Sequence, residues 1–178
     1  MKLVPEAEAV WRLQDYAGPR AIAGVEIVDL PCFRDDGGSM TELARLADGR
    51  IAGLEGFVAA QVNYATVAPG AIKAFHVHRR QTDVWFVPPS DRLLLVLVDV
   101  REGSGTSGAR MRLVLGDGQS RLVRVPPGIA HGCRNLGGET ARILYFADGQ
   151  FCEDPGRCDE GRLPWDFAGP DVWEIRRE

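Results

Sequence analysis

The stretch that decides the fold of this chain is Gly70-Ala71-Ile72-Lys73-Ala74-Phe75-His76-Val77-His78-Arg79-Arg80-Gln81-Thr82-Asp83. His76 and His78 stand two positions apart, so in a β-strand both imidazoles point to the same face. Asp83 opens the next β-rich run after a short turn and can face the same side. This spacing predicts two strands that carry a polar pocket on their inner face.

A second stretch, Pro126-Pro127-Gly128-Ile129-Ala130-His131-Gly132-Cys133-Arg134-Asn135, supplies the remaining histidine of the chain. His131 follows a Pro-Gly turn, and the turn aims its side chain. A single strand histidine is more often an ordinary hydrogen-bonded residue than a functional one. Here all the histidines fall in two motif-like stretches, which favours one shared site built around His76, His78, Asp83 and His131.

Short β-rich runs recur from Gln61 onward, separated by Gly, Pro, Asp or Ser. Several short strands at this spacing predict an all-β sandwich or barrel, because the long helices of an α/β sheet are missing from the pattern. The apolar run Leu93–Val98 predicts a strand buried on both faces, as in a double-sheet jelly roll or at a subunit interface. The predicted strands are 61–67, 82–87, 93–100, 110–115, 121–125, 132–135 and 142–146.

The segments on either side of the barrel core, expected over about 58–150, are less regular. The N-terminal extension 1–57 is predicted to hold a short helix over 7–16, a first strand over 24–30, a turn at 35–38 and weak helical character over 41–47. The tail 151–178, rich in Asp, Gly, Pro and Trp, is predicted to wrap the barrel. We expect a single domain over 1–178.

Composition narrows the classes of function. A net charge of −4 argues against a general nucleic-acid binder, which needs a basic face. No apolar run approaches the roughly 20 residues that cross a bilayer, and the N-terminus does not read as a secretory signal. The four cysteines form no CxxC pair and are interpreted as reduced thiols, with a Cys152–Cys158 bridge as the alternative. A cytoplasmic protein is expected.

The two stretches resemble the two motifs of the cupin superfamily. The first follows the pattern G-x5-H-x-H with an acid further on, here Asp83 where Glu is usual, and the second matches P-x-G-x2-H-x3-N in full. The resemblance implies a cupin-type double-stranded β-helix, a jelly-roll barrel with a short N-terminal helix and a C-terminal wrapping tail. Its metal-binding members suggest a divalent transition-metal site; the ligands in this reading are His76, His78, Asp83 and His131.

A narrower resemblance covers the chain from about Phe33 to Trp173. The sequence is similar to the dTDP-4-dehydrorhamnose 3,5-epimerase family, a branch of the cupins. The matching segments, in order, are Gln61-Val62-Asn63, Gly70-Ala71-Ile72-Lys73-Ala74-Phe75-His76, Asp99-Val100-Arg101-Glu102-Gly103-Ser104-Gly105-Thr106-Ser107-Gly108, Val125-Pro126-Pro127-Gly128-Ile129-Ala130-His131-Gly132-Cys133, Leu144-Tyr145-Phe146 and Trp165-Asp166.

This resemblance implies a chemistry: removal of the proton next to the ketone of a dTDP-4-dehydro-6-deoxysugar, and its return to the opposite face. The reaction needs a base, an acid and a donor to the enolate oxygen, and no cofactor. By the match, His76 is the base, Tyr145 the acid, and Asp166 orients His76. The residues implied in binding the nucleotide sugar are Glu42, Gln61, Asn63, Lys73 and His131.

The sequence departs from the family at two positions where the family carries a positive charge. Asp83 stands where the family has a lysine, and Gly37 stands where it has an arginine that helps to bind the nucleotide. A carboxylate repels a developing enolate, so either a metal held by His78, Asp83 and His131 restores positive charge or this reaction is not catalysed.

Three functions therefore stay open: an epimerase, a metal-dependent cupin (oxygenase or metal-assisted isomerase), and a non-catalytic sugar- or nucleotide-binding cupin. By analogy with cupins, and from the long apolar strand at Leu93–Val98, we expect a homodimer.

Overall fold

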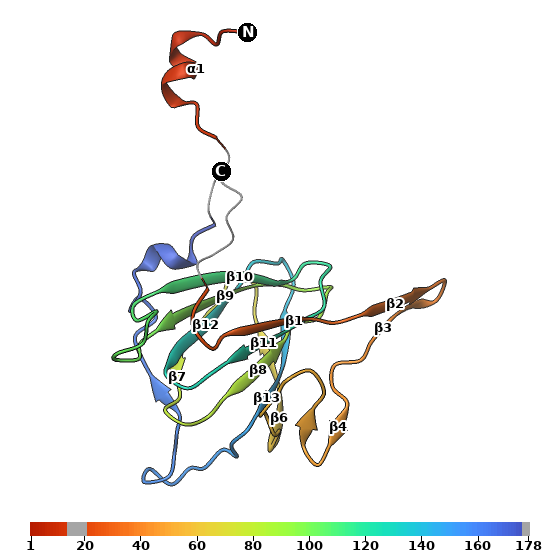
Figure 1. Cartoon of the computed structure of the whole chain (residues 1–178). Helices are drawn as coiled ribbons and strands as arrows, with labels where there is room; N and C mark the ends of the chain where they lie inside the picture. Colours follow the sequence, from red (N-terminus) through yellow and green to blue (C-terminus); the bar gives the residue numbers. More distant parts are fainter. Residues whose placement is uncertain (14–20, 176–178) are drawn as a thin grey trace.

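The structure, a computed structural model, describes residues 1–13 and 21–175 (Figure 1). Ten strands form two antiparallel five-stranded sheets that face each other. The first sheet has the order β1 (Glu26–Asp29), β11 (Arg121–Val125), β8 (Asp83–Phe86), β13 (Ala141–Ala147), β6 (Gln61–Val67). The second has the order β10 (Arg110–Gly116), β9 (Arg92–Asp99), β12 (Ile129–Asn135), β7 (Ile72–Val77), β14 (Gly161–Arg162). The fold is the cupin-type jelly roll that the motifs predicted.

The remaining elements are small and lie outside the barrel sheets. A hairpin of β2 (Cys32–Asp35) and β3 (Gly38–Thr41) projects from the barrel, and its turn is the one predicted at 35–38 (Figure 1). A second short pair follows, β4 (Leu46–Ala47) with β5 (Arg50–Ile51). Helix α1 spans Pro5–Val10, and a 3₁₀ turn, η1, spans Pro170–Trp173.

The central strand β9 shows how the core is built. Leu93, Leu95 and Leu97 point between the two sheets and pack in the main core with Trp85 and Val123. This alternation follows from the period of two along a strand. These buried side chains hold the two sheets together, and the packed sheets fix the positions of the polar residues on the inner face of the barrel.

The outer face of β9 is covered by the C-terminal tail. Leu94 and Val96 pack against Ala168, Val172 and Trp173. The prediction that this strand is buried on both faces is confirmed, since the whole run from Leu93 to Val98 is buried. The second cover comes from the same chain, so this strand gives no argument for a subunit interface.

Two local predictions differ from the structure. The segment 41–47 contains no helix, because its residues end β3 and form β4. The N-terminal helix ends at Val10, before the predicted end at Tyr16, and residues 14–16 of that prediction lie outside the described part of the chain. The sheets also take in β1 and β14, which lie outside the expected core of 58–150, because each pairs with a barrel strand.

Two further expectations concern the surroundings of the protein. Among the described residues, no helix has the length and apolarity that a bilayer-spanning helix needs. All four cysteines are free thiols, so the alternative bridge between Cys152 and Cys158 is not formed. The cytoplasmic location stays a prediction.

Candidate active site

A cavity of about 380 Å³ lies inside the barrel, between the facing sheets. It shares His76, Tyr145, Glu160 and Arg162 with a wider cavity of about 910 Å³. We call them the inner cavity and the mouth. The inner cavity is lined by Ala65, Ile72, Lys73, Ala74, His76, His78, Asp83, Trp85, His131, Cys133, Ile143, Tyr145, Glu160 and Arg162.

Strand pairing explains why both motif stretches reach this cavity. In the β7–β12 pair, His131 lies opposite His76, and Cys133 lies opposite Lys73. The count between these pairs is one residue longer on β7, which is a β-bulge. The bulge lets Lys73 and His76, three positions apart, both line the cavity although a regular strand would send them to opposite faces.

Gly132 permits this bulge, because a Cβ at that position would collide with Ala74 on the neighbouring strand. The glycine of the second motif therefore has a packing role: it brings β12 close to the bulged strand that carries His76.

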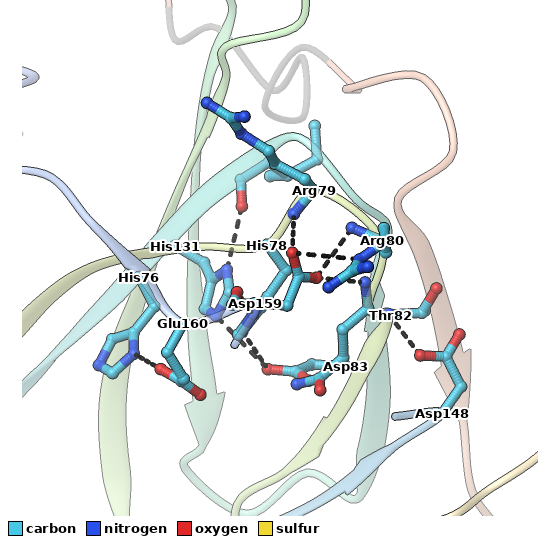
Figure 2. A network of polar contacts seen from close by, with 12 residues as sticks. His76, His78, Arg79, Arg80, Thr82, Asp83, His131, Asp148, Asp159 and Glu160 are labelled. Atoms are coloured by element: carbon cyan, nitrogen blue, oxygen red, sulfur yellow. Dashed lines mark hydrogen bonds and ion pairs between the residues drawn. The ribbon is translucent and has the colours of Figure 1, made fainter. Parts of the chain in front are cut away.

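His76 is held by a carboxylate from the tail. Its Nδ1 lies 3.3 Å from Glu160 Oε2, in the segment that leads into β14 (Figure 2). An ionised carboxylate only accepts, so Nδ1 carries the proton and Nε2 keeps its lone pair. Burial, followed by the positive charge of Arg162, outweighs Glu160 and lowers the pKa of His76. The imidazole is therefore neutral at neutral pH, which is the form that a general base needs.

Tyr145 faces the same cavity from β13, in the opposite sheet. It lies opposite Trp85 of β8, and the two ring centroids are 6.1 Å apart. Burial raises the pKa of Tyr145, and the charges of Asp83 and Glu160 raise it further. The phenol thus keeps its proton and can act as a hydrogen-bond donor or as an acid.

His78, Asp83 and His131 form a buried cluster beside this pair. Asp83 Oδ2 lies 3.6 Å from His78 Nε2 and 3.5 Å from His131 Nε2 (Figure 2). Burial disfavours the imidazolium of His78, but the hydrogen bonding and charge of Asp83 outweigh it and raise the pKa of His78 to about 9. Both histidines lower the pKa of Asp83, despite its burial. The carboxylate is therefore ionised and strongly attracts positive charge.

The tail fixes the loop that carries His78. The carboxylate of Asp159 accepts the backbone N–H groups of Arg79, Arg80 and Gln81 at 3.2, 2.9 and 2.9 Å (Figure 2). The backbone carbonyl of Asp159 accepts a hydrogen bond of 2.7 Å from His78 Nδ1. One residue of the tail thus orders the turn after β7 and orients its histidine.

The sequence-predicted binding residues are distributed over both cavities. Gln61 and Asn63 line the mouth and share a hydrogen bond of 2.8 Å, while Lys73 and His131 line the inner cavity. Glu42 lies apart from both linings and forms an exposed ion pair with Arg45 at 3.0 Å. The structure therefore brings Glu42 into neither cavity.

The structure differs from the prediction for the carboxylate that orients the base. Asp166 is an exposed residue of a turn, where its carbonyl accepts the N–H of Gly169, and it lines neither cavity. The acid that bonds to His76 is Glu160. The structure therefore does not bring Asp166 to His76 as the match at Trp165-Asp166 implied, because Glu160 takes that position.

Sequence reasoning missed several residues of the site. Glu160 and Arg162 line both cavities, and the mouth also contains Arg157 and Asp159. They come from the stretch of the tail around β14, where no repeat or motif stands out in the sequence. Their position depends on β14 pairing with β7, where Arg162 lies opposite His76.

One matched motif has a structural role away from the cavity. Asp99 is buried and accepts hydrogen bonds from Arg101, Ser104 and Thr106. The Arg101 side chain also lies against Gly128, where a Cβ would collide with it. The segment after β9 therefore supports the turn that precedes His131.

The comparisons with known proteins agree with one another. Residues 19–165 match the family model of dTDP-4-dehydrorhamnose 3,5-epimerase. The spore coat polysaccharide biosynthesis protein SpsL of Bacillus subtilis is 38% identical over 145 residues, which cover 82% of this chain and 91% of that protein. The probable low-salt glycan biosynthesis epimerase Agl13 of Haloferax volcanii is 31% identical over 104 residues, covering 58% of this chain and 65% of that protein.

Solved structures give the same result for the fold. A dTDP sugar isomerase from Desulfovibrio desulfuricans superposes with a TM-score of 0.74 at 25% identity, over 85% of this chain and 92% of that one. An epimerase from Legionella pneumophila, in complex with dTDP-4-keto-L-rhamnose, has a TM-score of 0.67 at 21% identity, over 82% and 76% of the two chains. Because the family match spans most of its length, this chain belongs to the dTDP-4-dehydrorhamnose 3,5-epimerase family of isomerases.

Proposed function

We propose that this protein epimerises a dTDP-4-dehydro-6-deoxysugar at a carbon next to the ketone, with His76 as base and Tyr145 as acid. The observation that carries the proposal is the pairing of His76 with Glu160 on one wall of a cavity whose opposite wall presents Tyr145. A base and an acid on opposing sheets can act on the two faces of one sugar ring.

The proposed reaction has two proton transfers. His76 Nε2 takes the proton from the carbon, the C–H bond breaks, and its electron pair passes into an enolate. The Tyr145 hydroxyl then gives a proton to the opposite face of that carbon, and the ketone forms again. Proton exchange with water returns both side chains to their starting states. The reaction needs a neutral imidazole and a protonated phenol at the same pH. The site favours both, because it lowers the pKa of His76 and raises the pKa of Tyr145.

The enolate oxygen needs a hydrogen-bond donor on the wall of the cavity. Trp85 offers one: its indole Nε1–H is buried and has no hydrogen-bond partner among the described residues. Trp85 lines the inner cavity and lies beside Tyr145. A buried donor without a partner costs free energy unless a ligand satisfies it. We therefore assign Trp85 to the substrate oxygen.

The mouth suits the charged nucleotide part of such a substrate. It contains Arg80, Arg157 and Arg162, and its volume of about 910 Å³ is in the range of ligand sites. Guanidinium groups bind phosphate oxygens well, because their paired N–H donors match that geometry. We propose that these arginines take over the role of the family arginine replaced by Gly37. This epimerase reading needs no cofactor for the proton transfers.

The test is incorporation of deuterium from heavy water. The protein is incubated with dTDP-4-dehydro-6-deoxyglucose in deuterated water, and the sugar carbons are followed by nuclear magnetic resonance. We expect exchange next to the ketone, with loss of exchange in His76→Asn. In Tyr145→Phe, deuterium exchange at the carbon should be reduced less than inversion of its configuration. The base His76 can still remove the proton, but the acid that returns one to the opposite face is missing. Binding of the sugar nucleotide without any exchange would instead identify a non-catalytic binding protein.

We also propose a homodimer, formed along the edge strand β6. β6 is the last strand of its sheet, and its outer face exposes Val62 and Tyr64. Exposed edges with apolar side chains tend to pair with another chain. Light scattering should give twice the mass of the chain, and the double substitution Val62→Glu with Tyr64→Glu should give the monomer. A wild-type monomer at micromolar concentration would refute this assignment.

A further inference from the structure

Three atoms that could bind a metal ion lie close together in the buried cluster. Asp83 Oδ2 lies between His78 Nε2 and His131 Nε2, and the ligand atoms of all three residues lie within 4.8 Å of one another. The residues are 4%, 3% and 2% exposed for His78, Asp83 and His131. Water therefore solvates none of these charges well, and their hydrogen-bonding needs must be met inside the cluster.

Backbone carbonyls decide the tautomer of both histidines. His78 Nδ1 lies 2.7 Å from the carbonyl oxygen of Asp159, and His131 Nδ1 lies 3.0 Å from that of Ile129. A carbonyl oxygen only accepts, so each Nδ1 carries a proton. Each Nε2 therefore faces the Asp83 carboxylate as an N–H donor when its imidazole is protonated, and as a lone pair when its imidazole is neutral. When both imidazoles are neutral, the two lone pairs and the carboxylate oxygen repel one another unless a metal cation lies among them.

The distances from Asp83 Oδ2 to the two histidine nitrogens distinguish a direct hydrogen bond donated by an imidazolium from ligation of a metal ion. A charge-assisted hydrogen bond from an imidazolium to a carboxylate is about 2.7–2.9 Å long. The two contacts with Asp83 Oδ2 are longer, at 3.6 and 3.5 Å. Ligand atoms on a tetrahedral ion, with bond lengths of about 2.0–2.1 Å, lie about 3.3–3.4 Å from each other. The separations are thus closer to those of ligands around a metal than to those of a direct hydrogen bond.

We propose that His78, Asp83 and His131 bind a divalent transition-metal ion at the wall of the inner cavity. Two imidazole nitrogens and one carboxylate oxygen are a donor set that suits zinc, iron, manganese, cobalt or nickel. His76 is not among the proposed ligands, because the group whose ligand atoms lie within 4.8 Å of one another consists of His78, Asp83 and His131. The sequence predicted four protein ligands, and the proposed site has three of them.

The surroundings of the cluster resemble those of known metal sites. Histidine ligands almost always donate their other N–H to a carbonyl or carboxylate, as both do here. The second oxygen of Asp83, Oδ1, accepts a hydrogen bond of 2.9 Å from the Gln81 amide. Each ligand is therefore held in place by a partner outside the set, so the site is ordered before an ion arrives.

The ion would add positive charge where the chain carries Asp83 instead of the family lysine. The cluster lines the same cavity as Tyr145 and Trp85, so the charge would face a bound substrate. A bound divalent ion is often the largest charge in a site and stabilises developing negative charge. The binding proposal stands apart from the proposed reaction, since it rests on the three ligands alone.

Metal content of the untagged protein is the first measurement. Protein purified without chelator is analysed by mass spectrometry for the metals named above. A second sample is stripped with a chelator, and Zn²⁺ or Co²⁺ is added back under calorimetric and optical observation. We expect close to one ion per chain, an increase in thermal stability on loading, and the intense visible bands of low-symmetry Co²⁺. Failure of the stripped wild-type protein to take up any of these ions would overturn the proposal.

Variants locate the ion. Asp83→Asn and His131→Gln should lose binding, whereas Gln81→Ala should weaken it by about 10–100-fold, as expected for a residue that orients a ligand. His76→Asn and Glu160→Gln are the matched controls, because they alter a neighbouring histidine and carboxylate outside the set, and they should bind as the wild type does. Circular dichroism checks that each variant is folded. Binding that is unchanged in folded Asp83→Asn, or lost in His76→Asn, would contradict the ligand assignment, whatever the deuterium exchange shows.

Discussion

Glu160 and His76 are 84 positions apart in the sequence, yet Glu160 Oε2 lies 3.3 Å from His76 Nδ1 (Figure 2). They meet because β14, which follows Glu160 directly, pairs with β7. The carboxylate selects the tautomer that leaves Nε2 free to accept a proton, and its negative charge stabilises the imidazolium that forms. Glu160 is thus a positioning residue for the proposed base, in the manner of the acid in a catalytic triad.

Replacing Glu160 should therefore slow proton transfer without weakening substrate binding. We expect Glu160→Gln to lower kcat by about 10²–10⁴-fold, the range of general acid–base effects, with KM changed little. Steady-state kinetics and the rate of deuterium exchange measure this. Asp166→Asn is the control, since that exposed residue lines neither cavity, and it should keep wild-type kinetics. The reverse pattern would restore Asp166 as the partner of the base.

The pH profile should report Tyr145 on its alkaline side. The proposed acid works as the protonated phenol, which is present below its pKa and lost above it. Burial and the nearby carboxylates raise that pKa above the ordinary value of about 10. The value of kcat/KM should therefore stay level through neutral and mildly alkaline pH and decline only above about pH 10. A decline near pH 8 that persists in Tyr145→Phe would assign the alkaline limb to another group.

Asp99 should make stability depend on pH at the acid end. Hydrogen bonds from Arg101, Thr106 and Ser104 lower its pKa in the folded state, despite burial. A lowered folded-state pKa stabilises the protein above the unfolded-state pKa of about 3.9, and this stabilisation is lost as pH falls below it. Asp99→Asn should lose about 3 kcal/mol at pH 7, as for a broken buried ion pair. Urea unfolding at pH 7 and pH 3 should show a smaller difference between variant and wild type at pH 3.

Trp173 should be a principal anchor of the tail. It is buried, its ring centroid lies 5.2 Å from that of Phe75, and its Nε1–H donates to the carbonyl of Trp165 at 2.8 Å. Trp173→Ala should lower the free energy of unfolding by about 3–5 kcal/mol, the usual cost of truncating a buried tryptophan. Denaturant unfolding measures this loss. Trp165→Ala is the control, because that ring is half exposed and should cost much less.

Local spacing predicted an all-β sandwich or barrel, and the resemblance of two stretches to the cupin motifs predicted the jelly roll. His76 and His78, two positions apart, both line the inner cavity as predicted, although β7 ends at Val77 and His78 lies in the loop after it. The unbroken apolar run from Leu93 to Val98 is buried on both faces, as predicted. The strands 61–67 and 121–125 were predicted with the bounds that the structure has, because turn residues limit both of them. These properties depend on neighbours in the sequence, so the sequence alone determines them.

Other features required the tertiary structure. The choice of Glu160 rather than Asp166 depends on which tail segment pairs with β7. The cover of Leu94 and Val96 by the tail depends on where the chain returns after the last barrel strand. The bulge that turns Lys73 inward depends on how β7 aligns with β12. Each of these features is a contact between residues far apart along the chain. The packing of the whole barrel decides such contacts, so the spacing of residues along the sequence does not predict them.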